Sequence, residues 1–335
     1  MADTHFSDLG RVEAIRQLYE GTPFKPFVSK GFTASAKSVV VPAARLFVEG
    51  VDFNLVYFPL KHLGYKCVTA VTGELLAAFS HPRTLQLRFA LSAKLDFDEV
   101  RQLWEGAVAA AKEQGYAEVG LDLQPSPNGL SISVSATGET PQLSDKRRPQ
   151  PKTKDLLCVS GNLGAAYLGM QLLEHGRERF ESGMQLPDLE QYRLFAGAYL
   201  KPELDASVVE RLEEAEIYPS AGVFVSRGLA DAVKTLVRDT GLGAKVYADH
   251  IPFEGNSFEL GRKLDIDPVS AACNGGDDCR LLFAVPILSM EKFRRDFQTF
   301  SIIGHLAQDE VGAVLVTTDG AELPLRAQGW KEAED

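Results

Sequence analysis

The sequence predicts a two-domain protein of the α/β class, in which strands and helices alternate on both sides of a polar linker. The chain has 335 residues, more than the ~100–200 residues of a usual single domain. Residues 141–154 (PQLSDKRRPQPKTK) hold three prolines and five basic residues, which indicates a linker or an exposed loop. A phosphate-binding basic patch is the alternative, although such charge runs are usually solvated. We therefore place an N-terminal domain at residues 1–140 and a C-terminal domain at residues 155–335.

The N-terminal domain is predicted to contain three strands and two helices. The strand segments are β-branched or alternate in polarity, and they lie at residues 38–48, 84–92 and 130–137. The helix segments, 60–79 and 97–114, carry apolar residues at helical spacing. Asp96 and Glu99 stand where a capping box would begin the second helix.

The C-terminal domain is predicted to alternate strands and helices in the same way. Its predicted strands lie at 156–160, 220–225, 244–248, 280–285, 300–304 and 312–317. Its predicted helices lie at 163–174, 188–200, 205–215, 227–240 and 289–298, the last capped by Ser289.

Composition excludes several functional classes. Lys and Arg number 35 against 46 Asp and Glu, and the net charge of −11 argues against a nucleic-acid partner. No apolar run reaches the ~20 residues that span a bilayer, and residues 1–15 lack the pattern of a signal peptide, so no membrane association is expected. The four cysteines are scattered without zinc-ligand spacing. We expect a soluble cytoplasmic protein with buried, reduced thiols.

Three segments could carry chemistry, each with a plain structural alternative. Residues 274–283 (NGGDDCRLLF) place two carboxylates after two glycines, which suits a metal or a substrate hydroxyl, or simply a turn. Residues 120–127 place Asp122 before a proline-containing loop, where a metal carboxylate could stand. Residues 161–164 (GNLG) join a strand to a helix, where free N–H groups can bind phosphate, or where the helix merely begins.

Taken in order, short motifs resemble those of the thiamine-monophosphate kinase family, in the superfamily of aminoimidazole ribonucleotide synthetase and selenophosphate synthetase. The resemblance covers roughly residues 30–330. The N-terminal matches are Val48–Phe53 to VEGVHF, Leu63–Lys66 to LGWK, Gly73-Glu74 to SD, Leu121-Asp122 to GGDT, and Ser131–Val134 with Gly138-Glu139 to TISVTVIGE. The C-terminal matches are Asp155–Gly161 to DLIYVTG, Leu200–Pro202 to YLRP, Ser226–Leu229 to SDGL, Gly275–Asp278 to GGED, Leu281–Phe283 to LLF, Ile303-Gly304 to IGR, and Gly329-Trp330 to GY.

The resemblance implies a two-domain fold like that of aminoimidazole ribonucleotide synthetase. N-terminal strands would pair across a homodimer, and a C-terminal α/β sandwich would pack beside them. It implies that ATP binds between N-terminal domains through Mg²⁺ ions held by aspartates, and that its γ-phosphoryl passes to thiamine monophosphate.

The resemblance also assigns roles to individual residues. Asp122 and Glu74 would be catalytic and metal-binding. Nucleotide-side contacts would come from Gly73, Arg45, Arg227, Ser226 and Gly164. Substrate contacts would come from Gly275, Gly276, Asp277, Asp278, Asp52 and Trp330.

The departures from the family concentrate at its metal-binding aspartates. The family's GDDAA element corresponds to Lys30–Ala36, which holds no acid, and its GDSAAG turn reads Gly164-Ala165-Ala166. Arg45 and Arg227 stand where the family has aspartates. Reversing one charge at ~4 Å changes a pair energy by several kcal/mol in an effective dielectric of about 20, so two arginines would disfavour Mg²⁺ and could bind phosphate directly. Alternatively, they pair with Asp122, Glu74 or Glu49 on a fold kept for another purpose.

Three functions follow from this pattern. The first is a kinase-like homodimer with a degenerate nucleotide site and weak or lost activity, a pseudoenzyme that binds a small phosphorylated ligand or a protein. The second is an active kinase whose metal shell is rebuilt from Glu74, Asp122, Asp277 and Asp278. The third is a non-catalytic interaction scaffold. Magnesium-dependent ATP binding would favour the second, and metal-free binding through Arg227 would favour the first.

Overall fold

The computed structural model describes residues 11–25, 38–182 and 190–327, which form two compact units. Unit 1 comprises residues 1–145 and 203–210, and unit 2 comprises residues 146–202 and 211–335. Two of the three boundaries fall within α5 (Gln142–Arg147) and α8 (Val208–Glu214), and the third falls between residues 202 and 203. The first boundary lies inside the segment predicted as a linker, whereas the assignment of residues 203–210 to unit 1 has no counterpart in the sequence prediction.

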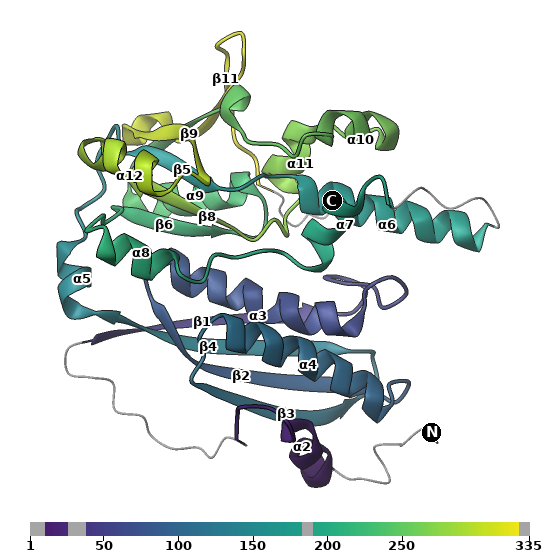
Figure 1. Ribbon diagram of the computed structural model, residues 1–335. Helices are drawn as coiled ribbons and strands as arrows, with labels where there is room; N and C mark the ends of the chain where they lie inside the picture. Colours follow the sequence, from purple (N-terminus) through teal and green to yellow (C-terminus); the bar gives the residue numbers. More distant parts are fainter. Residues whose placement is uncertain (1–10, 26–37, 183–189, 328–335) are drawn as a thin grey trace, which may run out of the picture. The chain divides into compact units, whose positions relative to one another are not determined.

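Unit 1 is a four-stranded sheet with two long helices on one face (Figure 1). The strand order is β1-β4-β2-β3, with β2 and β3 parallel and the other neighbouring pairs antiparallel. The strands are β1 (Ser38–Val48), β2 (His81–Ser92), β3 (Glu118–Ser126) and β4 (Ser131–Pro141). The covering helices are α3 (Leu60–Ala77) and α4 (Phe97–Glu113).

Alternating side chains give the sheet of unit 1 two different faces. Leu85, Leu87 and Phe89 of β2 are buried beneath the helices, as are alternate residues of β4. The intervening residues of both strands, mostly Ser, Thr and Gln, lie on the opposite face. The short helix α2 (Arg11–Tyr19) packs at the β3 edge, where the Trp104 indole N–H donates to the Leu18 carbonyl at 2.6 Å.

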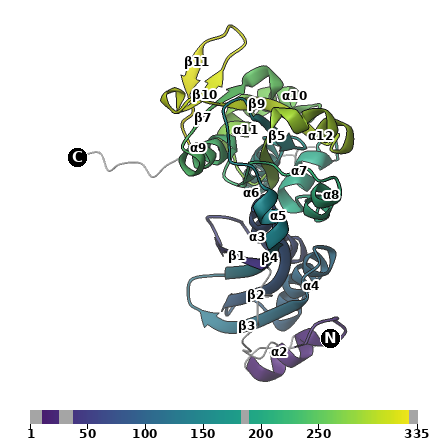
Figure 2. The same cartoon turned by 90° about the vertical axis from the view of Figure 1, so that its left-hand side faces the viewer.

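Unit 2 is built on a seven-stranded sheet in the order β11-β10-β7-β9-β5-β8-β6. Figure 2 shows the β10–β11 hairpin at one edge of this sheet. The strands are β5 (Leu156–Ser160), β6 (Ala221–Val225), β7 (Gly243–Tyr247), β8 (Arg280–Val285), β9 (Phe300–Ala307), β10 (Ala313–Val316) and β11 (Glu322–Pro324). The helices are α6 (Ala165–Glu181), α7 (Arg193–Leu200), α9 (Leu229–Thr240), α10 (Ser257–Leu264), α11 (Pro268–Asn274) and α12 (Met290–Asp296).

Two apolar clusters hold unit 2 together. The larger cluster joins the sheet to α9 and contains the fully buried Val159, Val233 and Leu282. The smaller cluster joins α6, α7, α10 and α11 around Leu168 and Phe195. The four cysteines are buried, as predicted, and none forms a disulfide; burial raises the pKa of the Cys158 thiol to about 12. Within the described ranges, no helix combines the length and apolarity needed to cross a membrane.

Several elements differ from the sequence prediction for identifiable reasons. Residues 120–127 were expected to lead into a loop, but they belong largely to β3, an edge strand, where Pro125 removes no ladder bond that the sheet needs. Ser289 precedes α12 without a capping side-chain bond, so that part of the prediction is wrong. By contrast, Asp96 and Glu99 form the predicted capping box of α4.

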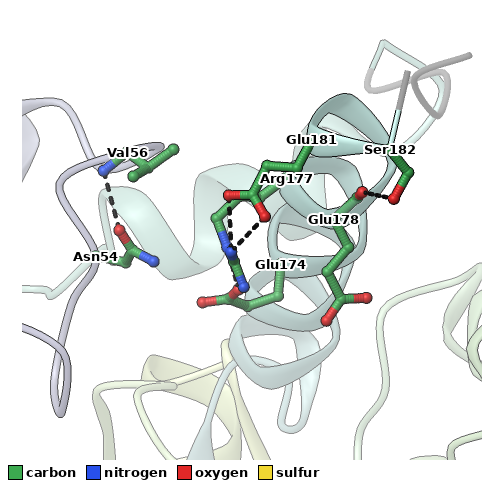
Figure 3. Close-up of polar contacts among 7 residues, drawn as sticks. All are labelled: Asn54, Val56, Glu174, Arg177, Glu178, Glu181 and Ser182. Atoms are coloured by element: carbon green, nitrogen blue, oxygen red, sulfur yellow. Dashed lines mark hydrogen bonds and ion pairs between the residues drawn. The ribbon is translucent and has the colours of Figure 1, made fainter. Parts of the chain in front are cut away.

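Helix α6 runs seven residues past its predicted end at residue 174, to Glu181. The Arg177 guanidinium bonds to Glu174 and to Glu181 at 2.9 Å each, one turn away in either direction (Figure 3). The Ser182 hydroxyl donates to the Glu178 carbonyl at 2.8 Å. Such pairs contribute about 0.2–0.5 kcal/mol each, which supports a helical end that few apolar contacts stabilise.

Candidate ligand-binding site

Three loops of unit 2 meet at one edge of its sheet. They are the β5–α6 loop (residues 161–164), the β6–α9 loop (residues 226–228) and the α11–β8 loop (residues 275–279). Strand β8 runs antiparallel to both β5 and β6, so its first residue lies beside their last residues. The topology therefore brings together three segments that are far apart in the chain. We call these three segments the loop cluster.

Asp278 is the buried centre of the loop cluster. Its side chain is 4% exposed, and its carboxylate accepts the N–H of Gly164 at 2.8 Å and the N–H of Ala166 at 3.1 Å. The Gly164 amide belongs to the residue just before α6, and the Ala166 amide belongs to the first turn of the helix. Burial raises the pKa of this carboxyl to about 7, against the opposing effects of the two amides and of Arg280. Asp278 thus caps α6, and the Gly164 amide donates to this carboxylate rather than standing free for a phosphate.

The neighbouring residues of the same loop hold the β6–α9 loop. The Asp277 N–H donates to the Ser226 carbonyl at 2.8 Å. Gly276 has φ of 80°, and a Cβ placed on it would lie 3.1 Å from the same carbonyl oxygen. At this backbone geometry only glycine avoids both the strain and the crowding. The predicted residues Ser226, Arg227, Gly275, Gly276, Asp277, Asp278 and Gly164 are therefore brought together.

Arg227 is the exposed cation of the loop cluster. In the part of the chain that the structure describes, it forms no ion pair. It directly precedes Gly228, which begins α9 without a side-chain cap. An exposed guanidinium next to the uncapped first turn of a helix favours an anionic ligand.

Four side chains to which the sequence analysis gave no role form hydrogen bonds in or beside the loop cluster. The Arg280 Nε donates to the Asn162 carbonyl at 3.2 Å, and the Asn162 amide donates to Glu254 at 2.9 Å. The Leu281 N–H donates to the Ser160 hydroxyl at 2.9 Å. None of these contacts follows a recognisable spacing in the sequence, because each joins segments that are far apart in the chain.

The two acids predicted to hold metal lie in different parts of unit 1. Asp122 stands opposite Arg88 in the β2–β3 register, on the sheet face away from α3 and α4. Glu74 lies in the last turn of α3, on the other side of the sheet, and Gly73 is buried beside it in the same helix. The sheet therefore separates the two carboxylates within one chain.

Arg45 also lies apart from Asp122. It stands on β1, at the opposite edge of the sheet from β3, and pairs in register with the buried Val134. Its guanidinium lies 5.2 Å from the centre of the Phe47 ring. The alternative of an ion pair between Arg45 and Asp122 is therefore wrong.

Other predicted acids of unit 1 bond to the backbone. The Asp52 carboxylate accepts the Val48 N–H at 2.8 Å, which fixes the turn after β1. The Glu49 carboxylate accepts the Leu130 N–H at 2.7 Å and joins that turn to the start of β4. Trp330 and residues 30–36 lie outside the described residues.

The donor set does not fit a magnesium site. Across residues 11–25, 38–182 and 190–327, no three His, Cys, Asp or Glu side chains gather closely enough to hold a metal ion. Mg²⁺ takes near-octahedral oxygen ligands, usually one or two carboxylates together with waters and substrate phosphates. The Asp278 carboxylate bonds to two backbone amides at the start of α6, and the sheet separates Asp122 from Glu74, so the described residues of one chain bring no two of these carboxylates together.

Comparison with known proteins gives a consistent fold and a family resemblance. No protein-family model matches the chain. The thiamine-monophosphate kinase of Aquifex aeolicus is 24% identical over 283 residues, covering 84% of each chain. The crystal structure of that kinase from Stenotrophomonas maltophilia superposes with a TM-score of 0.73 at 23% identity, covering 93% of this chain and 96% of the other. A ThiL structure complexed with AMPPCP and TMP gives 0.70 at 20% identity, covering 96% and 97%.

Proposed function

This chain is a distant sequence relative of the thiamine-monophosphate kinases and has their fold, and from that premise we propose that it binds a phosphorylated ligand with weak or lost kinase activity. The observation that carries the proposal is the scattering of its remaining motif acids. Phosphoryl transfer depends on positioning and on charge neutralisation, much of which metal ions supply. Asp122 and Glu74 lie on opposite sides of a sheet and Asp278 caps a helix, so the described residues of one chain bring no two of these carboxylates together, which supports the proposal.

The ligand class follows from the charge that remains. Arg227 is exposed beside the first turn of α9, and it replaces a family aspartate. A guanidinium binds phosphate bidentately and needs no metal to do so. The related structure crystallised with AMPPCP and TMP supports two candidates for this chain, namely ATP and thiamine monophosphate.

A homodimer is part of the proposal. The sheet face of unit 1 that points away from α3 and α4 carries Leu46, 58% exposed, beside rows of Ser and Thr. Small polar and apolar side chains on a flat sheet suit packing against a second copy. Light scattering at micromolar concentration should give twice the monomer mass of 36.6 kDa, and a monomer would contradict this part.

The decisive experiment is calorimetric titration of the full chain with AMPPCP, once with Mg²⁺ and once with EDTA. We expect binding that persists in EDTA and weakens at least ~10-fold in Arg227→Ala, the loss of one charge-assisted contact. Arg238→Ala is the matched control, because Arg238 is an exposed arginine at the other end of α9 that pairs with Asp239 at 2.7 Å.

Other outcomes of this titration separate the alternatives. Binding that requires Mg²⁺ and is lost in Asp122→Asn would favour a kinase with a rebuilt metal site, and turnover of thiamine monophosphate would then be measured. Absence of binding in both buffers would favour an interaction scaffold.

A further inference from the structure

The Asp278 carboxylate is the most deeply buried acid of the loop cluster, and the motif resemblance gave it a different role. It was expected to contact substrate, yet it is 4% exposed and both of its oxygens accept backbone N–H groups of α6. A carboxylate at a helix N-terminus satisfies amides that have no partner within the helix and interacts favourably with the helix dipole. The Asp278 carboxylate therefore bonds to the protein backbone.

The α11–β8 loop also connects Asp278 to the segment that carries Arg227. Asp277 is covalently adjacent to Asp278, and its N–H holds the Ser226 carbonyl. Ser226 is in turn adjacent to Arg227. Gly228 fixes the far side of that loop, because a Cβ on it would lie 2.3 Å from the Cys273 carbonyl oxygen of α11. A displacement of Asp278 from α6 would thus move the segment that presents Arg227.

We propose that Asp278 is a positioning residue that locks the α11–β8 loop onto the first turn of α6 and thereby holds Ser226 and Arg227 in the arrangement that binds a phosphate-bearing ligand. The choice of ligand in this inference rests on the proposed function. The link between the α11–β8 loop and α6 rests only on the hydrogen bonds described above. Asp278 itself does not touch the ligand.

The charges around Asp278 make the lock sensitive to pH. Burial raises its pKa to about 7 from an ordinary value of 3.8, Asp277 adds to the rise, and the two α6 amides and Arg280 of β8 oppose it. The titratable or charged groups of the adjoining segments include Tyr167 of α6, Cys273 of α11, the buried Cys279 next to Asp278, and Arg227 of the β6–α9 loop. Burial also raises the pKa of the Cys273 thiol, to about 11, so it stays neutral through this range.

The sign of the pH effect follows from the raised pKa. The folded chain holds this proton more tightly than the unfolded chain, so the contribution of Asp278 to stability is complete below its ordinary pKa and is lost as the pH rises through about 7. The two effects of ionisation oppose each other: the ionised carboxylate bonds more strongly to the Gly164 and Ala166 amides, but the cost of burying its charge is larger, so the net effect of ionisation is a loss of stability.

The test compares Asp278→Asn with Asp239→Asn in the full chain. The first variant keeps the size and removes the charge of the cap, and the second makes the same change at an exposed acid at the far end of α9. We expect exchange of the Gly164 and Ala166 amide hydrogens to accelerate by ~10-fold or more in Asp278→Asn and to change less than ~2-fold in Asp239→Asn. AMPPCP affinity in EDTA should fall by ~5-fold or more in Asp278→Asn only.

A second measurement covers the case in which Asp278→Asn does not fold. In the wild-type chain, the side-chain carbon of Asp278 and the backbone amides of Ser226 and Arg227 should titrate with one shared midpoint in nuclear magnetic resonance spectra. The proposal would be overturned if the chemical shifts of the Ser226 and Arg227 amides did not change at the midpoint of the Asp278 titration. Unchanged amide exchange in Asp278→Asn would overturn it as well. If wild-type protein binds no AMPPCP, the proposed function fails, while the exchange and titration data still decide whether Asp278 locks the loops.

Discussion

The acids of unit 1 and the acids of unit 2 occupy comparable family-like motifs, but they differ in how close together the fold places them. In unit 1, Asp122 lies on β3 and faces away from α3, the helix that carries Glu74, so the sheet separates the two carboxylates. In unit 2, Asp277 and Asp278 lie at the start of a strand, where loops from three parts of the chain meet. Side chains along strands are held at fixed separation and alternate faces, whereas residues at strand ends converge. Among the described residues, the motif acids of unit 2 therefore lie together and those of unit 1 do not.

The largest expected effect comes from crowding the loop cluster. Gly228→Ala should lower the free energy of unfolding by about 3 kcal/mol, because the new Cβ meets the Cys273 carbonyl and the backbone holds φ at 94°. Urea unfolding followed by circular dichroism measures it. Gly241→Ala is the control at the other end of α9, with φ of 67° and nothing within 4 Å, and should cost about 1 kcal/mol. Equal losses in the two variants would mean that the loop cluster is loosely packed.

An intermediate effect is expected from replacing an acid of unit 1 whose carboxylate accepts a backbone N–H. Glu49→Ala should cost about 1–2 kcal/mol, because it leaves the Leu130 N–H without its charged acceptor. Urea unfolding of unit 1 gives the value. Glu105→Ala removes only an exposed ion pair with Lys61 and should cost ~0.5 kcal/mol or less. A neutral Glu49→Ala would show that this carboxylate is available for another role, and would weaken the contrast between the units.

The smallest expected effect concerns the acids that the family resemblance assigned to metal. Asp122→Asn and Glu74→Gln should each change stability by ~0.5 kcal/mol or less and leave AMPPCP binding in EDTA unchanged. The same calorimetric titration measures both. Loss of Mg²⁺-dependent binding in either variant would mean that the carboxylates meet in an arrangement that a single described chain lacks, and the contrast between the units would collapse.

The sequence predicted the elements of the fold well where local signals were strong. The alternation in residues 130–137 gave β4, and Asp96 with Glu99 gave the start of α4. Local signals misled where tertiary position decides, as for Pro125, which an edge strand tolerates, and for the end of α6, which the Arg177 ion pairs extend. Ordered motifs assigned Gly164, Ser226 and Arg227 to a nucleotide and Gly275–Asp278 to a substrate, but they did not predict that these loops of unit 2 meet. They could not show that Asp278 faces α6 or that Arg45 and Asp122 stand at opposite edges, because both depend on strand order.

The pairing of β5 has a consequence for how the chain acquires its structure. β5 is the first strand of unit 2 in the sequence, but both of its neighbours, β8 and β9, are synthesised much later. The residue that caps α6 is also synthesised late, since the Gly164 N–H bonds to Asp278, 114 positions downstream. Contacts of such long sequence separation are slow to form, and a nascent chain that ends before residue 280 leaves β5 with two open edges. Unit 2 therefore depends on the ribosome finishing almost the whole polypeptide before its central strand is covered.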